Sequence, residues 1–532
     1  VYINIKLLYT KNRQMSRDLT MKKDKITIVG GGTAGWLAAL VISRRNPLYD
    51  VTVVSSEKIG VIGVGESTTG FFTNVVCNEF FNLDCDINEF ISETGATLKY
   101  SIKHKGWTKD KNQHYHGPID GWGFSENTED IFLKYALAYE TDQDELLSIS
   151  QMGSYISTGK SNFNNGHFTD VSHAMHIDAH LAGQYFRKKC LQKDNVVHFD
   201  TEVINVNLDE KGYISSIDCA DGKNIKSDIF IDCTGFKRLL LNKLGAKWHS
   251  YKENLPVKAA IPFHLPYNQN EMPEPYTTAT ALSAGWMWQI PLMDRKGCGY
   301  AFDTDFITPD QAYSEIESKL GTKVDASPLI KFDSGRQEES WIKNCIAIGL
   351  SSAFLEPLEA TSIHTTLCQI KSLSDEFILS NAKDTLNTGS IELYNKRTRL
   401  LFDDTRDFLV MHYMGGRNDT EFWKYISSGN TQTEYVKNLI EMSKYKVPGP
   451  NDFPSYFGAA GWGLYSHVMK GLGLLDPAMC RKNIESDFLQ IPFTKTLVDH
   501  DYRPLKEFIA TRSENSLSYN SFIQYFRDKR KN

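Results

Sequence analysis

Residues 25–35 read Lys-Ile-Thr-Ile-Val-Gly-Gly-Gly-Thr-Ala-Gly, and this stretch decides the fold. The β-branched run at 25–29 predicts a buried parallel strand, and the apolar run at 36–42 predicts a helix directly after the glycines. A second short strand is expected at 50–54. Strand, glycine turn, helix and strand at this spacing form a βαβ unit, which predicts an α/β fold built on a doubly wound parallel sheet.

The glycine turn predicts the first binding site. Its glycines match GxGxxG, in which the first allows a tight turn, the second lets the backbone approach a pyrophosphate, and the third lets helix and strand pack closely. Free N–H groups at the start of the following helix suit the negative charge of a pyrophosphate. The residues that we expect to bind a dinucleotide here are Gly30, Gly32, Thr33, Ala34 and Gly35.

A carboxylate that binds the ribose hydroxyls is expected about 20 residues further on. The second strand ends in Ser55 and Ser56, and Glu57 follows. Glu57 is the candidate for this role. The alternative is a surface loop charge, with the ribose held by other groups, and the sequence leaves both open.

Composition excludes several classes of protein. The 532 residues carry 59 Lys and Arg against 65 Asp and Glu, a formal net charge of -6, so no basic nucleic-acid-binding face is expected. No run of about 18 uncharged apolar residues occurs, so no membrane-spanning helix is expected. The nine cysteines include no CxxC pair, which predicts no disulfide framework and no metal site, but reduced thiols in a cytoplasmic protein.

Three further motifs point to a family. Residues 62–67 read Ile-Gly-Val-Gly-Glu-Ser, residues 285–291 read Gly-Trp-Met-Trp-Gln-Ile-Pro, and residues 349–361 read Gly-Leu-Ser-Ser-Ala-Phe-Leu-Glu-Pro-Leu-Glu-Ala-Thr. Alone, the WxWxIP motif indicates two tryptophans on one face of a core strand. Together, the three motifs make the chain resemble the flavin-dependent halogenases of the tryptophan halogenase type, over residues 22–475.

The resemblance implies the reactants and several site residues. Such halogenases use reduced FAD, O2 and a halide to make hypohalous acid, and the protein leads this oxidant to a separate aromatic substrate. The residues implied to contact FAD outside the glycine turn are Gly65, Glu66 and Gly349. Those implied for the tunnel and the substrate side are His116, Trp286, Trp288, Ile290 and Pro291.

The resemblance also implies two catalytic residues. Aligning backward from Trp107 places Lys99 on the family's relay lysine, with Lys103 as the neighbouring alternative. A dry tunnel would lower the pKa of this lysine and expose its lone pair. The family's glutamate is the second of Glu-Pro-Leu-Glu, hence Glu359, which could accept the ring proton or polarise the oxidant. The alternative is that Glu356 and Glu359 cap or form ion pairs near the start of the following helix.

Two departures from the family pattern concern specificity. The backbone N–H groups of Thr361 and Ser362 match the family's halide pocket, where an anion suits free amides. Ser362 replaces the usual glycine, which predicts a preference for bromide or iodide over chloride. Residues 454–462 carry small side chains where tryptophan-specific members have aromatic clamps. They predict a wide apolar pocket for an indole-like or phenol-like substrate other than free tryptophan.

The implied organisation is one compact unit of two interleaved modules, with residues 1–21 as a disordered extension. The FAD-binding module is expected to comprise 22–104, 166–244 and 331–375, because strands predicted at 227–232 and 344–349 rejoin the parallel sheet. The mostly helical substrate-side module is expected to comprise 105–165, 245–330 and 376–532.

Two other functions compete with a halogenase. An FAD-dependent aromatic monooxygenase shares the nucleotide fold but needs its substrate at the flavin and no relay lysine. A catalytically silent FAD-binding protein would need neither Lys99 nor Glu359. No second nucleotide motif is visible, which predicts that a separate flavin reductase supplies the reduced FAD. We expect no nucleic-acid or membrane partner, and a homo-oligomer is left open.

Overall fold

The computed structural model describes most of the chain. The described residues are 23–60, 63, 65–77, 83–119, 136–139, 142–148, 150–169, 173–453, 462–490 and 516–531. The extension predicted at 1–21 lies outside them, as do residues 454–461 of the predicted substrate segment.

A six-stranded sheet forms the nucleotide-binding layer, in the order β10-β2-β1-β14-β23-β22. Its strands are β1 (Asp24–Val29), β2 (Tyr49–Ser55), β10 (Val196–Asp200), β14 (Ile229–Asp232), β22 (Trp341–Ile342) and β23 (Cys345–Ala347). All neighbours are parallel except the β22–β23 edge pair. The predicted α/β fold is confirmed, and the strands predicted at 227–232 and 344–349 rejoin this sheet through β14 and β23.

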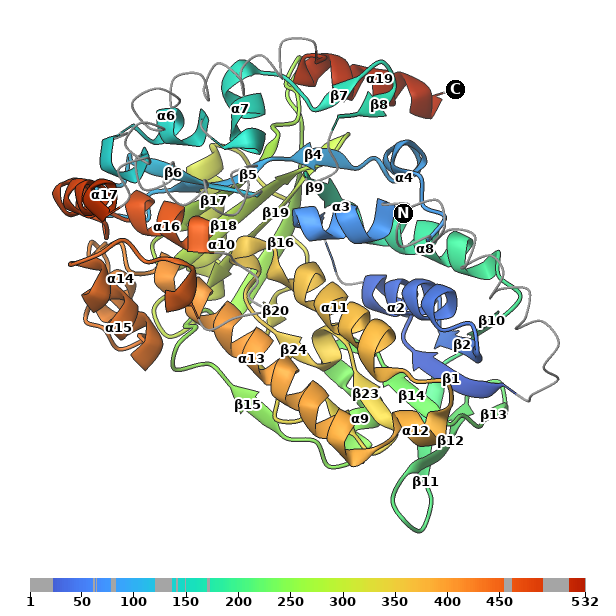
Figure 1. Ribbon diagram of the computed structural model, residues 1–532. Helices are drawn as coiled ribbons and strands as arrows, with labels where there is room; N and C mark the ends of the chain where they lie inside the picture. Colours follow the sequence, from blue (N-terminus) through green and yellow to red (C-terminus); the bar gives the residue numbers. More distant parts are fainter. Residues whose placement is uncertain are drawn as a thin grey trace.

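Different elements cover the two faces of this sheet. Helix α2 (Thr33–Arg45) starts at the glycine turn and packs against α8 (Ala179–Leu191) and α11 (Thr361–Ser372), so that it is buried on nearly every side. The opposite face packs on α9 (Leu239–Lys243) and on a sheet of three strands. These strands are β11 (Val203–Leu208), β12 (Ile214–Cys219) and β13 (Asn224–Ile225). Figure 1 shows α2 and α11 beside the parallel strands.

A seven-stranded sheet forms the second layer, in the order β20-β16-β19-β18-β17-β5-β6. Its strands are β5 (Ser101–Lys105), β6 (His114–Pro118), β16 (Ala259–Pro266), β17 (Tyr276–Leu282), β18 (Gly285–Pro291), β19 (Arg295–Phe302) and β20 (Ile330–Lys331). All its pairs are antiparallel except β17–β5. The substrate side was expected to be mostly helical, and this large sheet is an addition to that expectation.

The alternation of side chains gives the second sheet an inner and an outer face. Ile102, Thr277, Trp286 and Trp288 share the inner face, which the pairing register sets. The outer face packs on α10 (Pro309–Leu320) through a separate apolar cluster. The inner face therefore turns toward the nucleotide-binding layer.

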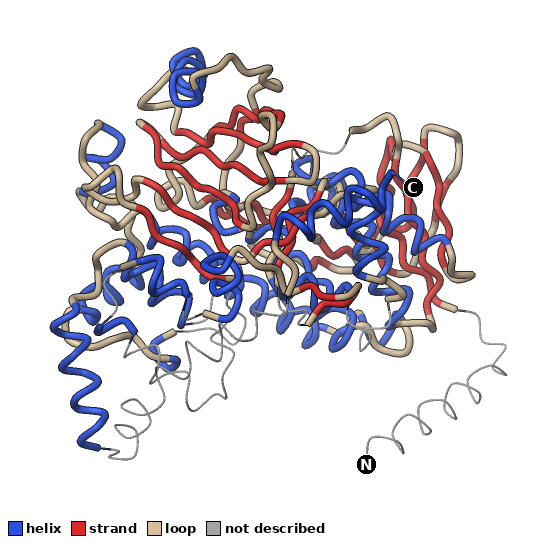
Figure 2. The backbone as a smooth tube through the Cα atoms, turned by 90° about the horizontal axis from the view of Figure 1, so that it is seen from above, coloured by secondary structure: helices blue, strands red, loops and turns tan. Residues whose placement is uncertain are grey.

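The remaining elements link and cover the two layers. The short strands are β3 (Glu66–Ser67), β4 (Thr97–Lys99), β7 (Phe163–Asn164), β8 (His167–Phe168), β9 (Ala174–Ile177), β15 (Trp248–Ser250), β21 (Gly335–Gln337) and β24 (Ala353–Phe354). The helices are α3 (Gly70–Cys77), α4 (Ile87–Thr94), α6 (Gln143–Ser148), α7 (Gln151–Thr158), α12 (Ala382–Thr385), α13 (Thr388–His412), α14 (Glu421–Ser427), α15 (Glu434–Ser443), α16 (Trp462–Gly471), α17 (Pro477–Gln490) and α19 (Tyr519–Lys531). Seen from above in Figure 2, the strands gather in two main groups with helices packed beside both.

Two sequence expectations about the whole chain can be compared with the fold. All nine cysteines are free thiols, as the absence of paired spacings predicted. Within the described part of the chain, no helix is long and apolar enough to cross a membrane.

Candidate active site

A cavity of about 760 Å³ lies between the glycine turn and the inner face of the second sheet. Its lining includes the glycine turn, the end of β2, the segment after β14, the start of α11 and the inner face of β16–β18. This volume is in the range of cofactor and ligand sites. The cavity therefore joins the predicted nucleotide site to the WxWxIP strand.

The three glycines of the turn have separate structural roles. Gly30 has φ +118°, and a Cβ there would lie 2.2 Å from the Cys233 carbonyl oxygen. A Cβ on Gly35 would lie 1.9 Å from the Gly30 carbonyl oxygen. A Cβ on Gly32 would meet no protein atom within 4 Å, and no side chain caps the helix that starts after it. The open space at Gly32 and the uncapped helix N-terminus fit the pyrophosphate of FAD.

Thr33 and Ala34 line the same cavity. Gly349 follows β23 with φ +68°, and a Cβ on it would lie 2.8 Å from Ala34 Cβ. Gly349 therefore abuts the glycine turn and itself lines the cavity. The structure thus brings the first and the third sequence motifs into contact.

Glu57 lies at the edge of the cavity, two residues beyond the end of β2. Its carboxylate is largely exposed and accepts a hydrogen bond from Arg187 at 2.6 Å. Ser55 and Ser56 also line this end of the cavity. The ribose role of Glu57 stays a prediction.

The strap residues Gly65 and Glu66 line the middle of the cavity. Gly65 has φ +142°, and a Cβ there would lie 3.4 Å from the Leu292 side chain. Glu66 pairs with Ile177 across β3 and β9, and burial raises the pKa of its carboxyl to about 7. The other strap residues Ile62 and Val64 lie outside the described residues.

The WxWxIP strand forms one wall of the cavity through Trp286, Trp288 and Ile290. The ring of Trp288 lies where a side chain on Gly299 would be, since a Cβ there would be 2.1 Å from the indole. The Trp286 indole N–H donates to Glu356 at 3.1 Å. Pro291 is outside the cavity lining, and its carbonyl oxygen accepts from the Thr97 hydroxyl.

Lys99 ends β4 and is completely buried. Its Nζ donates to the Thr68 carbonyl oxygen at 2.9 Å. Burial lowers the pKa of Lys99 to about 7, while the charge of Glu359 acts in the opposite direction. Lys103, the neighbouring alternative, lies on the outer face of β5, with its ammonium 5.7 Å from the Tyr276 ring centroid. The buried environment needed for a relay amine is therefore found at Lys99.

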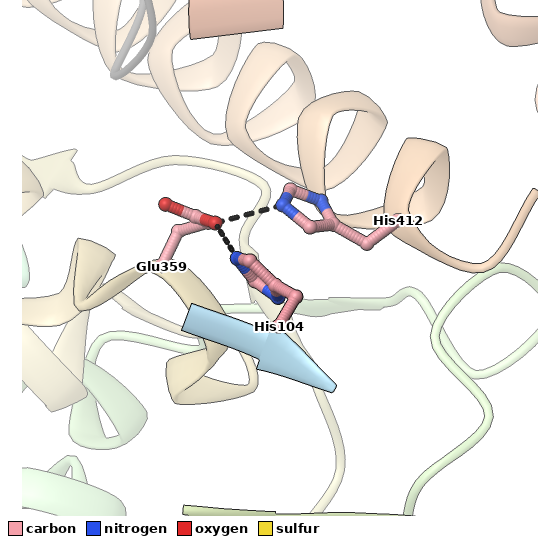
Figure 3. Close-up of side chains that lie close together, drawn as sticks. All are labelled: His104, Glu359 and His412. Carbon is pink, nitrogen blue, oxygen red and sulfur yellow. Dashed lines mark hydrogen bonds and ion pairs between the residues drawn. The ribbon is translucent and has the colours of Figure 1, made fainter. Parts of the chain in front are cut away.

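Glu359 accepts two hydrogen bonds on the same carboxylate oxygen (Figure 3). His104 Nε2 on β5 donates to Oε1 at 2.9 Å, and His412 Nε2 at the end of α13 donates to it at 2.7 Å. Burial alone would raise the pKa of the Glu359 carboxyl, but the two histidines outweigh burial and lower it to about 2. Glu359 is therefore an ionised carboxylate in a buried site, and both histidines were missed by the sequence analysis.

Glu356, three residues earlier, has the opposite environment. It is completely buried, and burial raises the pKa of its carboxyl to about 7. The Tyr413 hydroxyl and the Trp286 indole donate to its Oε2 at 2.7 and 3.1 Å. Neither glutamate side chain caps α11, whose N-cap is Ala360, whereas Glu359 does pair near the helix start, with His104 and His412.

The predicted halide residues begin α11. Ala360 has φ +57°, so that the backbone turns sharply before the helix and leaves its first N–H groups without a side-chain cap. Thr361 Oγ1 is buried and has no hydrogen-bond partner among the described residues. Ser362 lines the cavity. These free donors at a helix N-terminus suit an anion, and the halide role stays a prediction.

His116 is not on the cavity side of the sheet. It shares the outer face of β5 and β6 with Lys103, and its Nδ1 hydrogen-bonds the Ser101 hydroxyl at 2.7 Å. Its neighbour Gly117 has the inward position instead, where a Cβ would lie 3.9 Å from Glu359 Oε1. One step along a strand changes the face, so the register places Gly117 and not His116 on the cavity side; a structural role for His116 was the alternative, and its substrate role stays a prediction.

The fold and the cavity define a dinucleotide-binding protein in which Lys99 and Glu359 are buried apart from the glycine turn. A family model described as tryptophan halogenase matches residues 25–480. Tryptophan 6-halogenase SttH of Streptomyces toxytricini is 32% identical over 509 residues, which cover 87% of this chain and 94% of that protein.

Solved structures agree with this match. Tar14, a tryptophan C-6 flavin-dependent halogenase from taromycin biosynthesis, superposes with a TM-score of 0.81 at 29% identity, covering 95% of this chain and all of Tar14. BrvH, a flavin-dependent halogenase from Brevundimonas sp. BAL3, gives 0.78 at 26% identity, covering 95% of this chain and 99% of BrvH. The chain belongs to the tryptophan halogenase family and is a flavin-dependent halogenase.

Proposed function

We propose that the enzyme halogenates an electron-rich aromatic ring with hypohalous acid that Lys99 passes from the cofactor cavity to the substrate. Reduced FAD and O2 together provide the oxidant for the halide. A separate flavin reductase supplies the reduced FAD, since the sequence carries one dinucleotide motif. The observation that carries the proposal is Lys99: a fully buried amine whose pKa is lowered to about 7, so that a large fraction has a free lone pair at neutral pH.

The side chains of the cavity support the separate tasks. The uncapped helix start at Thr361 and Ser362 suits the halide, and the indole rings of Trp286 and Trp288 form an apolar part of the cavity wall. Lys99 holds the oxidant by hydrogen bonding or as a haloamine. Both hydrogen bonds to Glu359 end on Oε1, so Oε2 has no hydrogen bond among the described residues and is available to accept the ring proton.

The substrate is an indole-like or phenol-like ring. The names of the relatives, tryptophan 6-halogenase and tryptophan 7-halogenase, favour free tryptophan. The small residues at 454–462 favour a larger ring, and that segment lies almost wholly outside the described residues.

The test combines the enzyme with a flavin reductase, NADH, FAD, air and either bromide or chloride. Free tryptophan, larger indoles and phenols are supplied as a panel, and products are identified by isotope patterns in mass spectrometry. We expect halide-dependent products that Lys99→Ala abolishes and Lys103→Ala leaves unchanged. Products that form without halide would identify a monooxygenase instead, and efficient conversion of free tryptophan alone would refute the wide-pocket proposal.

A further inference from the structure

Both ring nitrogens of His412 face hydrogen-bond acceptors. Its Nε2 faces Glu359 Oε1 at 2.7 Å and its Nδ1 faces the Phe408 carbonyl oxygen at 2.9 Å. A carbonyl oxygen and an ionised carboxylate both act only as acceptors. Both nitrogens of His412 are therefore placed to donate, which is the arrangement of a positively charged imidazolium.

The position of His412 in the fold favours that charge. His412 is the last residue of α13, and the C-terminal end of a helix stabilises a cation. It is completely buried, so the adjacent carboxylate is its main source of compensation. His412 and Glu359 therefore form a buried ion pair with no net charge.

His104 binds the same oxygen but is neutral. Its Nε2 donates to Glu359 Oε1, while its Nδ1 is buried without a hydrogen-bond partner among the described residues. A neutral ring leaves only a lone pair unsatisfied there, whereas an imidazolium would bury an unpaired N–H. Burial lowers the pKa of His104 to about 4, which agrees with this assignment.

The three side chains also have the composition of a metal site, since their ligand atoms lie within 4.8 Å of one another. A metal ion would need the Nε2 lone pairs of His104 and His412. Both Nε2 atoms instead direct a proton at Glu359 Oε1. The hydrogen bonds therefore favour a protonated triad over a metal centre.

The groups that face Lys99 show why the compensation of the Glu359 charge affects the protonation of Lys99. Thr68 offers a carbonyl oxygen, and His176 on β9 is a buried ring whose pKa is held well below its usual value by burial. Glu359 supplies the charge that acts to keep Lys99 protonated. Any group that neutralises Glu359 therefore favours the amine form of Lys99.

We propose that His412 is the permanent counter-ion of Glu359 and thereby keeps Lys99 in its amine form. His412 is a positioning residue, because it acts on Lys99 through the carboxylate. Its value for catalysis rests on the proposed relay by Lys99, but the electrostatic effect does not. The proposal predicts that Lys99 becomes an ammonium at neutral pH when the charge of Glu359 is no longer compensated by His412.

The experiment follows the protonation of Lys99 directly. The full chain is labelled with ¹³C at the lysine ε-carbons, and the NMR signal of Lys99 is identified by its loss in Lys99→Met. The signal is titrated in the wild type and in His412→Gln, which keeps a donor to Glu359 but carries no charge. The matched control is His104→Gln, which makes the same change at the neutral member of the triad.

We expect the Lys99 midpoint to rise by at least one pH unit in His412→Gln and by less than half as much in His104→Gln. The double variant His412→Gln with Glu359→Gln is expected to bring the Lys99 midpoint back to within half a pH unit of the wild type, because it also removes the carboxylate that His412 no longer compensates. An unchanged midpoint in His412→Gln, equal shifts in the two histidine variants, or a double variant that stays shifted would each overturn the proposal.

Folding and function are read separately. Circular dichroism and thermal unfolding check each variant, and the double variant tests the same charge balance if His412→Gln alone does not fold. The titration needs no flavin, halide or substrate. A protein that shows these shifts but makes no halogenated product would overturn the relay function and leave the counter-ion assignment in place.

Discussion

Replacing Lys99 by methionine tests whether the lysine lies in a desolvated site. The pKa of Lys99 is lowered from 10.5 in the unfolded chain to about 7 in the fold, and the residue is completely buried. A shift of this size corresponds to roughly 4–5 kcal/mol of unfavourable free energy near pH 6, where both states are protonated. Lys99→Met removes this cost, so the variant is expected to be more stable than the wild type at neutral pH.

The pH dependence separates this effect from lost contacts. Because the pKa of Lys99 is lower in the folded protein, the unfolded chain binds more protons between pH 7 and 10.5, and wild-type stability rises with pH across that window. The cost of burying Lys99 falls from about 4 kcal/mol at pH 7 to about 2 kcal/mol at pH 9. Losing the hydrogen bond to Thr68 offsets about 1 kcal/mol at every pH.

The assay is the difference in Tm between variant and wild type at pH 7 and at pH 9. For a chain of this length 1 kcal/mol corresponds to about 1 °C, so the advantage of Lys99→Met should shrink by about 2 °C between the two pH values. Lys103→Met, which removes a lysine from the outer face of the neighbouring strand β5, is the control for the loss of a lysine charge outside the buried site. A difference for Lys99→Met that is the same at both pH values would refute the desolvated site.

Three further predictions concern the cofactor, the base and the halide. Gly32→Ala should fold normally but bind FAD at least tenfold more weakly, since its Cβ would enter only the open cavity. Gly35→Ala should also lose stability, because its Cβ overlaps the Gly30 carbonyl oxygen. Fluorescence titration measures the FAD affinity of each variant, and thermal unfolding measures its stability. Glu359→Gln should lower the halogenation rate by roughly 10²-fold or more with FAD affinity unchanged, measured in single turnovers, and an unaffected rate would exclude it as base. Ser362→Gly should move the bromide-to-chloride product ratio toward chloride at matched concentrations; an unchanged ratio would remove Ser362 from halide selection.

The nucleotide layer was predictable because its signals are local. The run at 25–35 contains the strand, the turn and the helix start within eleven positions, and the structure confirms the α/β fold built from it. The second sheet had one such signal, the WxWxIP motif of β18, and its other strands had none. β17 reads Tyr-Thr-Thr-Ala-Thr-Ala-Leu, with small or hydroxylated residues on both faces, so no apolar alternation marks it as a strand.

The site residues were predictable only where a sequence motif identified them. Lys99 and Glu359 came from the resemblance, and their environments had to come from the fold. His104 and His412 lie on different elements far apart in the chain, and no spacing rule joins them to Glu359. For His116 a usable signal existed, because alternation along β6 places Tyr115 and Gly117 on the opposite face from it.

The end of α13 explains why two glutamates three residues apart have different protonation behaviour. His412 hydrogen-bonds Glu359, and the adjacent Tyr413 donates to Glu356. Burial raises the pKa of both carboxyls; the two histidines at Glu359 outweigh burial and lower its pKa to about 2, whereas the donors to Glu356 do not, and its pKa is raised to about 7. The carboxyl with the raised pKa accepts a hydrogen bond from the Trp286 indole of the cavity wall, whereas the charge of the ionised Glu359 carboxylate acts on Lys99. Under the proposed function, this end of α13 therefore gives Glu356 a structural role and leaves Glu359 Oε2 as the acceptor for the ring proton.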